Sequence, residues 1–174
     1  MRYTLLVAAL AATVATPALA QASVTATVND ATAKGVVLLP LTLSETKPLD
    51  FGTVIADPNN PGNVVIDADT GARTVGGAVL GVPNYPGSRG LFQGAGTAGN
   101  AVVLTMSPPT VLTSGTNSLT VTSMTFDNNG GVSTTRTIDA TGAFAIGVGG
   151  DFAITANQPN GLYSATYSVT AEYQ

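Results

Sequence analysis

The sequence contains no cysteine, no histidine and no tryptophan, and only 9% of its 174 residues are charged. It therefore lacks the most frequent general base, the most frequent thiol nucleophile and most zinc ligands. Without cysteine pairs, packing and sheet hydrogen bonds must stabilise the fold. We expect a protein that is not an enzyme and that has no metal site and no cofactor.

Positive charge is also scarce. Beyond Arg2, five basic residues stand against ten acidic ones, a net charge of −5; they are Lys34, Lys47, Arg73, Arg89 and Arg136. Five scattered cations do not neutralise a run of phosphates. The composition therefore argues against nucleic acid and against anionic membranes as partners.

The first 20 residues have the pattern of an export signal. Arg2 precedes an apolar stretch over residues 4–15, Pro17 ends it, and Ala18-Leu19-Ala20 places small residues before a cleavage site at Gln21. The stretch is too short to span a bilayer, and no later stretch is apolar enough to do so. We expect a periplasmic, cell-surface or extracellular product that is not inserted in the membrane after signal cleavage.

Glycine is frequent in the rest of the chain among abundant threonine, serine, valine and alanine, and this composition predicts an all-β fold. We predict an immunoglobulin-like antiparallel β-sandwich over residues 35–174, preceded by an alternating extension or first strand over residues 21–34. The expected strands cover residues 36–43, 63–67, 78–81, 101–106, 118–126, 143–148, 152–155 and 162–173. Turn-forming clusters at residues 57–62, 83–87 and 127–131 separate them, and residues 94–100 are expected to form a mobile loop.

One predicted strand changes phase. Leu119 and Val121 lie on one face, but the next large apolar residues are Met124 and Phe126, so the alternation slips by one position. A β-bulge at Thr122 or Ser123 would restore the alternation. Burial of both faces near the end of the strand is the other explanation.

The clearest alternation occurs near the two ends of the chain. Ala22, Val24, Ala26 and Val28 alternate with polar residues, and a second pattern runs from Tyr163 through Tyr167 and Val169 to Tyr173. Such a pattern is typical of a strand with one buried face. Residues 22–28 are therefore either the first strand of their own domain or a donor strand that completes the sandwich of a neighbouring copy, with the last strand as its acceptor.

Asp67 and Asp69 would share one face of a strand at ~7 Å, as in an inverting glycosidase or a weak calcium site. The following Thr70-Gly71 instead favours a turn. A hairpin turn is likewise preferred to a metal site at residues 127–130, and residues 147–150 lack the helix and lysine of a phosphate loop.

The three tyrosines at 163, 167 and 173 are compatible with carbohydrate stacking, although alternation with alanine and valine is more typical of a core.

A family resemblance rests on motifs in a fixed order. They are Pro48-Leu49-Asp50-Phe51-Gly52-Thr53-Val54, the run from Val64 to Arg73, Ile146-Gly147-Val148-Gly149-Gly150, Gln158-Pro159-Asn160-Gly161-Leu162-Tyr163 and the final Tyr173. In these motifs the chain resembles the secreted bacterial family catalogued as domain of unknown function 4402. That family looks like a distant relative of the immunoglobulin-like pilus subunits assembled by chaperone and usher, and of spore-coat-type pilins. The cysteine pair of many such pilins is absent here.

The resemblance and the terminal strands predict an exported structural or adhesive surface protein. We expect a pilus-like or fimbria-like subunit that assembles by strand complementation, with another copy or an export chaperone as its partner. The alternative is a monomeric periplasmic or secreted module that binds a glycan or a cell-envelope partner. The sequence does not identify a small-molecule or glycan ligand.

Overall fold

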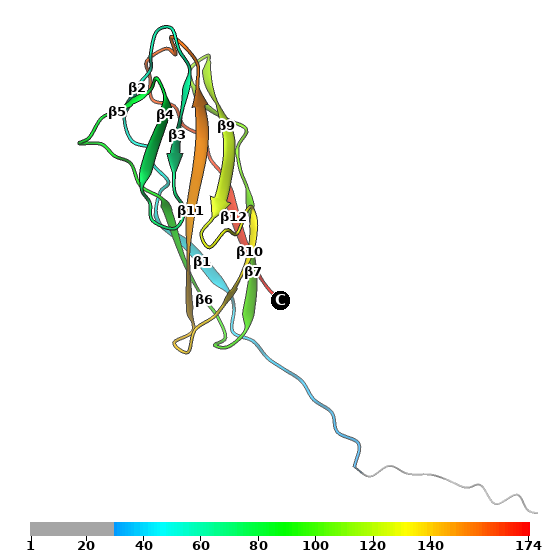
Figure 1. Ribbon diagram of the computed structural model, residues 1–174. Helices are drawn as coiled ribbons and strands as arrows, with labels where there is room; N and C mark the ends of the chain where they lie inside the picture. The colour runs from blue at the N-terminus through cyan, green and yellow to red at the C-terminus, as the bar shows by residue number, and fades with distance from the viewer. Residues whose placement is uncertain (1–29) are drawn as a thin grey trace, which may run out of the picture. The chain divides into compact units, whose positions relative to one another are not determined.

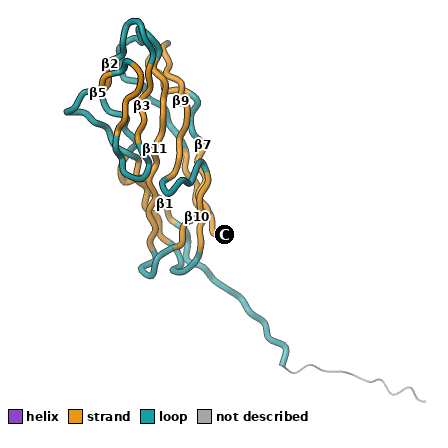
Figure 2. Tube along the Cα trace, viewed as in Figure 1, coloured by secondary structure: helices purple, strands orange, loops and turns teal. Residues whose placement is uncertain are grey.

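The computed structural model describes residues 30–174. Residues 30–36 have no regular secondary structure, and a compact unit extends from Val37 to Gln174. Its strands are β1 (Thr42–Lys47), β2 (Val54–Ile55), β3 (Gly62–Ile66), β4 (Arg73–Gly77), β5 (Leu80–Gly81), β6 (Gly90–Ala95), β7 (Ala101–Ser107), β8 (Val111–Ser114), β9 (Asn117–Phe126), β10 (Ser133–Thr137), β11 (Ala143–Ile154) and β12 (Ser168–Tyr173). Between residues 30 and 174 there is no helix, and hence none that could span a membrane (Figure 2).

The strands form two main antiparallel sheets, which confirms the predicted all-β sandwich-like fold (Figure 1). In the larger sheet, β6 and β3 pair with successive parts of the long strand β11, and β1 and β4 pair with β6 and β3, respectively. β9 pairs with β11 and with β8. The smaller sheet has the order β10-β7-β12, and β2 and β5 form a separate two-stranded ribbon. The larger core cluster draws on both sheets, because Leu104 of β7 and Ile146 of β11 are both buried in it.

β11 is the central strand of the larger sheet. It pairs with β6 and β3 along one edge and with β9 along the other. Residues 146–150 are buried throughout, and a Cβ at Gly149 would collide with the backbone of Ile66 and Ala68. Gly147, Gly149 and Gly150 therefore permit close approach of neighbouring segments, and the two strands predicted at 143–148 and 152–155 are one continuous strand.

The predicted bulge is confirmed. Asp151 of β11 pairs with Ser123, but the next residue, Phe152, pairs with Val121, so Thr122 is the extra residue of β9. The slip allows Leu119, Met124 and Phe126 all to be buried.

Several predicted boundaries were wrong. Residues 36–41 form no strand, and β1 begins only at Thr42. The rest of β1 was not predicted because its exposed residues are hydrophilic and mask the alternation around the apolar Leu43. The strand predicted at 78–81 is reduced to β5. The loop predicted at residues 94–100 is partly strand, since Gly94 and Ala95 belong to β6.

Candidate functional site

The last strand, β12, has one unpaired edge among the described residues. It pairs only with β7, with Ser168 opposite Ser107 and Tyr173 opposite Val102. The amide of Gln174 donates to the carbonyl of Ala101 at 3.0 Å, and the antiparallel pattern therefore turns the backbone groups of residues 168, 170, 172 and 174 toward β7. The N–H and C=O groups of Val169, Ala171 and Tyr173 consequently point to the free edge.

The side chains of β12 alternate as predicted. Val169, Ala171 and Tyr173 pack against the larger core cluster, whereas Ser168, Thr170 and Glu172 are exposed. The predicted strand over residues 162–173 is too long, however, because regular pairing starts only at Ser168. The preceding residues are joined to the sheet only through an isolated bridge between Ser164 and Thr113.

A second unpaired edge lies beside the first. β1 pairs with β6 only and contacts β12 without strand pairing (Figure 1). The Tyr173 hydroxyl donates to the carbonyl of Leu39 at 2.8 Å, just before β1 begins. A Cβ at Gly90 would meet both the Tyr167 hydroxyl and the backbone of Leu49, which places the start of β12 near the end of β1. The two edges thus run in opposite directions.

Apolar side chains line the space where these edges meet. Seven of them pack against the larger core cluster but are only partly buried: Leu41, Leu43, Leu49, Tyr167, Val169, Ala171 and Tyr173. We call this set the β1–β12 seam. Partly covered apolar residues between two free strand edges are what an added strand would complete.

Tyr167 is the most perturbed group of the seam. Its ring stands edge-on to Phe92, with the centroids 6.0 Å apart, and its buried hydroxyl has no hydrogen-bond partner among the described residues. Burial, with a smaller contribution from the negative charge of Glu45, raises the pKa of Tyr167 to about 12. The neutral phenol is thereby favoured over the phenolate.

The structure brings together only part of the predicted tyrosine stripe. Tyr163 lies outside β12 and packs against the smaller core cluster with Phe152 and Leu119. Its hydroxyl donates to the carbonyl of Pro159 at 2.7 Å and accepts from the Gln158 amide at 2.9 Å. Tyr163 is therefore not part of the acceptor edge and shares no stripe with Tyr167 and Tyr173.

The predicted donor residues Ala22, Val24, Ala26 and Val28 lie outside the described residues. The donor role of this segment therefore stays a prediction. The other side of the seam was not predictable from the sequence pattern, because Leu41, Leu43 and Leu49 occur in a stretch whose polar residues hide the alternation.

The segment with Asp67 and Asp69 is a turn. Asp67 Oδ1 accepts from the amides of Asp69 and Thr70 at 3.1 and 2.7 Å and from the Thr70 hydroxyl at 2.7 Å, and these bonds lower the pKa of Asp67. Gly71 follows with φ of 76°, where a Cβ is disfavoured. The Asp67 carboxylate is thus engaged by the turn itself, as the turn interpretation predicted.

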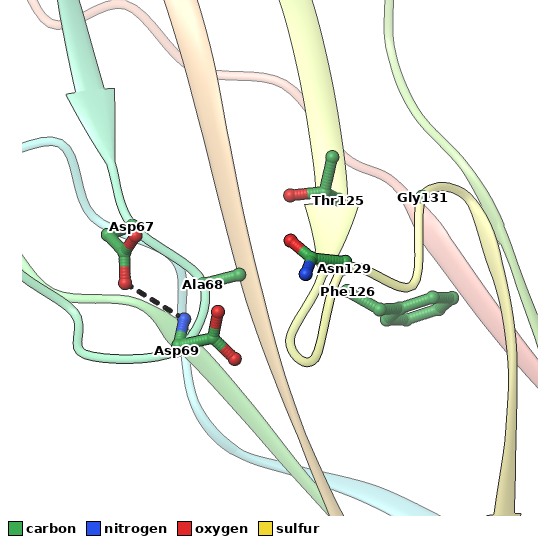
Figure 3. Close-up of a pocket in the computed structure, with 7 residues that line it drawn as sticks. All are labelled: Asp67, Ala68, Asp69, Thr125, Phe126, Asn129 and Gly131. Carbon is green, nitrogen blue, oxygen red and sulfur yellow. Dashed lines mark hydrogen bonds between the residues drawn. The ribbon is translucent and has the colours of Figure 1, made fainter.

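A shallow hollow of about 300 Å³ lies beside this turn (Figure 3). Asp67 and Asp69 line one side of it, and Thr125 and Asn129 line the other. Asp69 accepts from the amide of Asn128 at 2.6 Å, which ties the turn to the predicted hairpin turn at 127–130. Among residues 30–174 no group of three or more acidic side chains is arranged to hold a metal ion.

The motifs that carry the resemblance hold the fold together. Phe51 packs edge-to-face on Phe152 at 4.7 Å, and the Asp50 carboxylate accepts from the amide of Gly52 at 2.7 Å. Gly52 has φ of 75°, and a Cβ there would collide with the Tyr85 carbonyl and the Arg73 guanidinium. A larger residue at position 52 would therefore disrupt the contact between the Arg73 guanidinium and the backbone around Gly52 and Tyr85.

Arg73 is the centre of this contact, a role that the sequence pattern did not indicate. Its guanidinium donates to the carbonyls of Thr53, Val82 and Tyr85 at 3.0, 3.0 and 2.8 Å. No acidic partner is within salt-bridge distance in the described part of the chain. The fork of an arginine suits several carbonyls at once, so Arg73 fixes two backbone segments, at Thr53 and over residues 82–85, relative to β4.

Residues 41–173 have the sequence pattern of a known protein family. A family model described as "Domain of unknown function (DUF4402)" matches residues 41–173, and the chain belongs to this family. No curated protein and no solved structure matches the chain. The family description assigns no activity.

Proposed function

We propose that the protein is an exported structural subunit that polymerises by strand complementation. In this proposal, residues 22–28 of one copy add a strand to the free edge of β12 in the next copy. The observation that carries it is the β1–β12 seam, where two unpaired edges meet over partly covered apolar side chains. The signal pattern of residues 1–20 supports export.

The length and side chains of the donor suit the seam. β12 has six residues, and the donor segment covers seven positions with small inward-facing residues at 22, 24, 26 and 28. Because the seam already holds bulky leucines and tyrosines, an added strand needs only small side chains there. Main-chain bonds to Val169, Ala171 and Tyr173, at a net ~0.5–1.5 kcal/mol each, would supply much of the binding energy.

The direction of the donor decides the type of assembly. The chain leaves the domain near Leu39, at the end of the seam where Tyr173 lies. Folding back onto its own seam would make residues 22–28 parallel to β12. Binding antiparallel to β12 of another copy instead places the two domains end to end. That arrangement repeats without closing and extends a filament.

An unpaired apolar edge also requires protection before assembly. Exposed strand edges favour uncontrolled association. We therefore expect an export chaperone to cover the β12 edge until a donor strand replaces it.

The decisive experiment introduces a charge on the inward face of the donor. Val24→Asp would bury an unpaired carboxylate in the seam at a cost of several kcal/mol, whereas Thr25→Asp would face outward. We expect Val24→Asp to abolish the heat-sensitive ladder that strand-exchanged polymers give on denaturing gels. Thr25→Asp should leave the ladder intact.

A donor peptide spanning residues 22–30 provides the second arm. The Val24→Asp subunit should remain folded and should bind this peptide, with a raised melting temperature. If the variant unfolds and the peptide does not rescue it, residues 22–28 are the first strand of their own domain. A single band for the wild-type protein would favour the monomeric binding module.

A further inference from the structure

Two uncharged apolar surfaces lie at opposite ends of the unit formed by residues 37–174. The first is made of Ile55, Leu80 and Tyr85, which are 56%, 65% and 64% exposed. Ile55 and Leu80 are directly paired across β2 and β5, so their side chains lie side by side on one face. We call these three residues the apolar lobe.

The backbone of the apolar lobe is firmly held. The Tyr85 carbonyl accepts from the amide of Thr53 at 3.0 Å and from the Arg73 guanidinium at 2.8 Å, and the amide of Tyr85 donates to Val82 at 3.2 Å. Little backbone freedom is therefore lost when a partner covers these side chains. Exposure of apolar groups on a rigid support is a feature of interaction surfaces.

The second surface is concave. A hollow of about 360 Å³ is lined mainly by small or apolar residues, among them Leu39, Pro40, Ala95, Gly96, Ala98 and Ala140. We call it the base hollow. It is preformed, because the amide of Gly96 donates to Gly142 at 2.9 Å and the amide of Leu39 donates to the Thr97 hydroxyl at 2.7 Å.

The central strand separates the two surfaces. β11 begins at Ala143, next to the base hollow, and ends at Ile154, close to the ribbon that carries the apolar lobe (Figure 1). Asn157 donates to the carbonyl of Asp57 at 2.9 Å, which connects the far end of β11 to the segment after β2. At ~3.3 Å per residue, the strand itself spans roughly 36 Å.

We propose that the apolar lobe of one copy docks in the base hollow of the next copy. This proposal rests on the proposed function, because an antiparallel donor places the base of one domain at the far end of its neighbour. An exposed apolar surface at one end and a hollow at the other form a heterologous contact, which repeats along a filament. Neither surface carries a charged residue, so two acidic copies can meet there without desolvating a charge.

The linker length is compatible with this contact. Residues 29–38 separate the donor segment from Leu39, and ten extended residues reach at most ~33–36 Å. That reach equals the length of β11, so a donor bound in the seam allows the neighbouring base to lie at the apolar lobe. The occupant is therefore a second copy of this chain.

The absence of cysteine makes disulfide crosslinking a direct test. Asn84→Cys, beside the lobe, and Ala140→Cys, at the hollow, change exposed positions. Full-length assemblies containing both variants would be oxidised with copper phenanthroline and boiled in detergent without reductant. We expect a covalent dimer between the two variants and none from either variant alone.

Two controls make the result specific. Thr135→Cys, an exposed residue of β10, should not crosslink to Ala140→Cys. Adding Leu80→Asp to the Asn84→Cys subunit would bury an unpaired carboxylate, so the crosslink yield should fall at least about tenfold.

The same samples distinguish this proposal from the proposed function, because unboiled lanes report strand exchange and boiled lanes report the contact. A ladder with the specific crosslink supports the docking. A ladder without that crosslink, or with equal crosslinking to Thr135→Cys, overturns the docking and leaves strand exchange standing. Absence of both ladder and crosslink overturns both proposals. A crosslink without a ladder supports the contact and overturns strand exchange.

Discussion

The hydroxyl of Tyr173, in the last strand, donates to the carbonyl of Leu39 at 2.8 Å, just ahead of the first strand. The same oxygen accepts from the amide of Thr97 at 2.7 Å. One side chain therefore joins three segments: the chain that leads into β1, the turn after β6 and the end of β12. This junction lies between the β1–β12 seam and the base hollow.

Replacing Tyr173 with phenylalanine should loosen that junction. The ring still packs on the core, but the partly buried amide of Thr97 and the exposed carbonyl of Leu39 lose their partner, at a cost of about 0.5–1.5 kcal/mol. We expect a lower melting temperature and faster hydrogen exchange of the Thr97 amide. Unchanged exchange at Thr97 would contradict the bridging role.

Arg73→Lys should be strongly destabilising although it keeps the positive charge. An ammonium group lacks the planar fork that reaches the carbonyls of Thr53, Val82 and Tyr85, so we expect a loss of about 2–4 kcal/mol. Chemical denaturation measures this loss. The exposed Lys47→Ala is the control and should cost less than about 0.5 kcal/mol.

Tyr167 and Ser168 are neighbours with opposite environments. Tyr167 packs against Phe92 but is only partly buried, so truncation to alanine should cost about 2–3 kcal/mol, below the ~3–5 kcal/mol of a fully buried aromatic residue. Ser168→Ala on the exposed face should cost less than about 0.5 kcal/mol. Equal effects of the two substitutions would contradict the packing of β12.

The raised pKa of Tyr167 predicts a loss of stability in alkali. The folded protein keeps this phenol neutral up to about pH 12, whereas in the unfolded chain it ionises near its ordinary pKa of 10.0. The stabilisation is therefore complete below pH 10 and disappears as the pH rises through 12. Tyr167→Phe should remove this pH dependence, which chemical denaturation between pH 9 and pH 12 would measure. The same substitution should not lower stability at pH 7, because the hydroxyl has no hydrogen-bond partner among the described residues.

Acid should destabilise the fold through its turns. Hydrogen bonds from Thr141 and nearby amides lower the pKa of Asp139, and bonds from residues 59 and 60 do the same for Asp57. Both carboxylates favour the folded state above their ordinary pKa of 3.8, and this contribution is lost as the pH falls through the lowered values. Asp139→Asn should flatten the acid limb of the stability curve, and an unaltered limb would contradict the assignment.

The sequence alone was sufficient for the fold class and for features with strong local signals. The slip of alternation in β9 predicted the bulge, and Asp67 with Thr70 and Gly71 predicted a turn. In each case residues close in sequence provide the interaction. The face of β12 was also predictable, because alternation is a local property of an extended chain.

Features that depend on distant contacts were not predictable. The glycines at 149 and 150 read as a break between two strands, but close approach of β3 makes this segment the centre of the longest strand. Arg73 reads as a surface charge, but its partners lie 9 to 20 residues away. Tyr163 fits the alternation of the last strand, yet its hydrogen bond to Pro159 holds it in another cluster.

The position of Leu39 beside Tyr173 also determines how the domain bears tension. A pulling force applied to the chain before residue 39 first loads the hydrogen bonds of Leu39 with Thr97 and Tyr173. It then acts along the axis of β1. β1 is antiparallel to β6, and such a force loads the bonds between the two strands together in shear instead of opening them one at a time. Resistance to a pull along β1 is therefore a property of the single domain formed by residues 37–174.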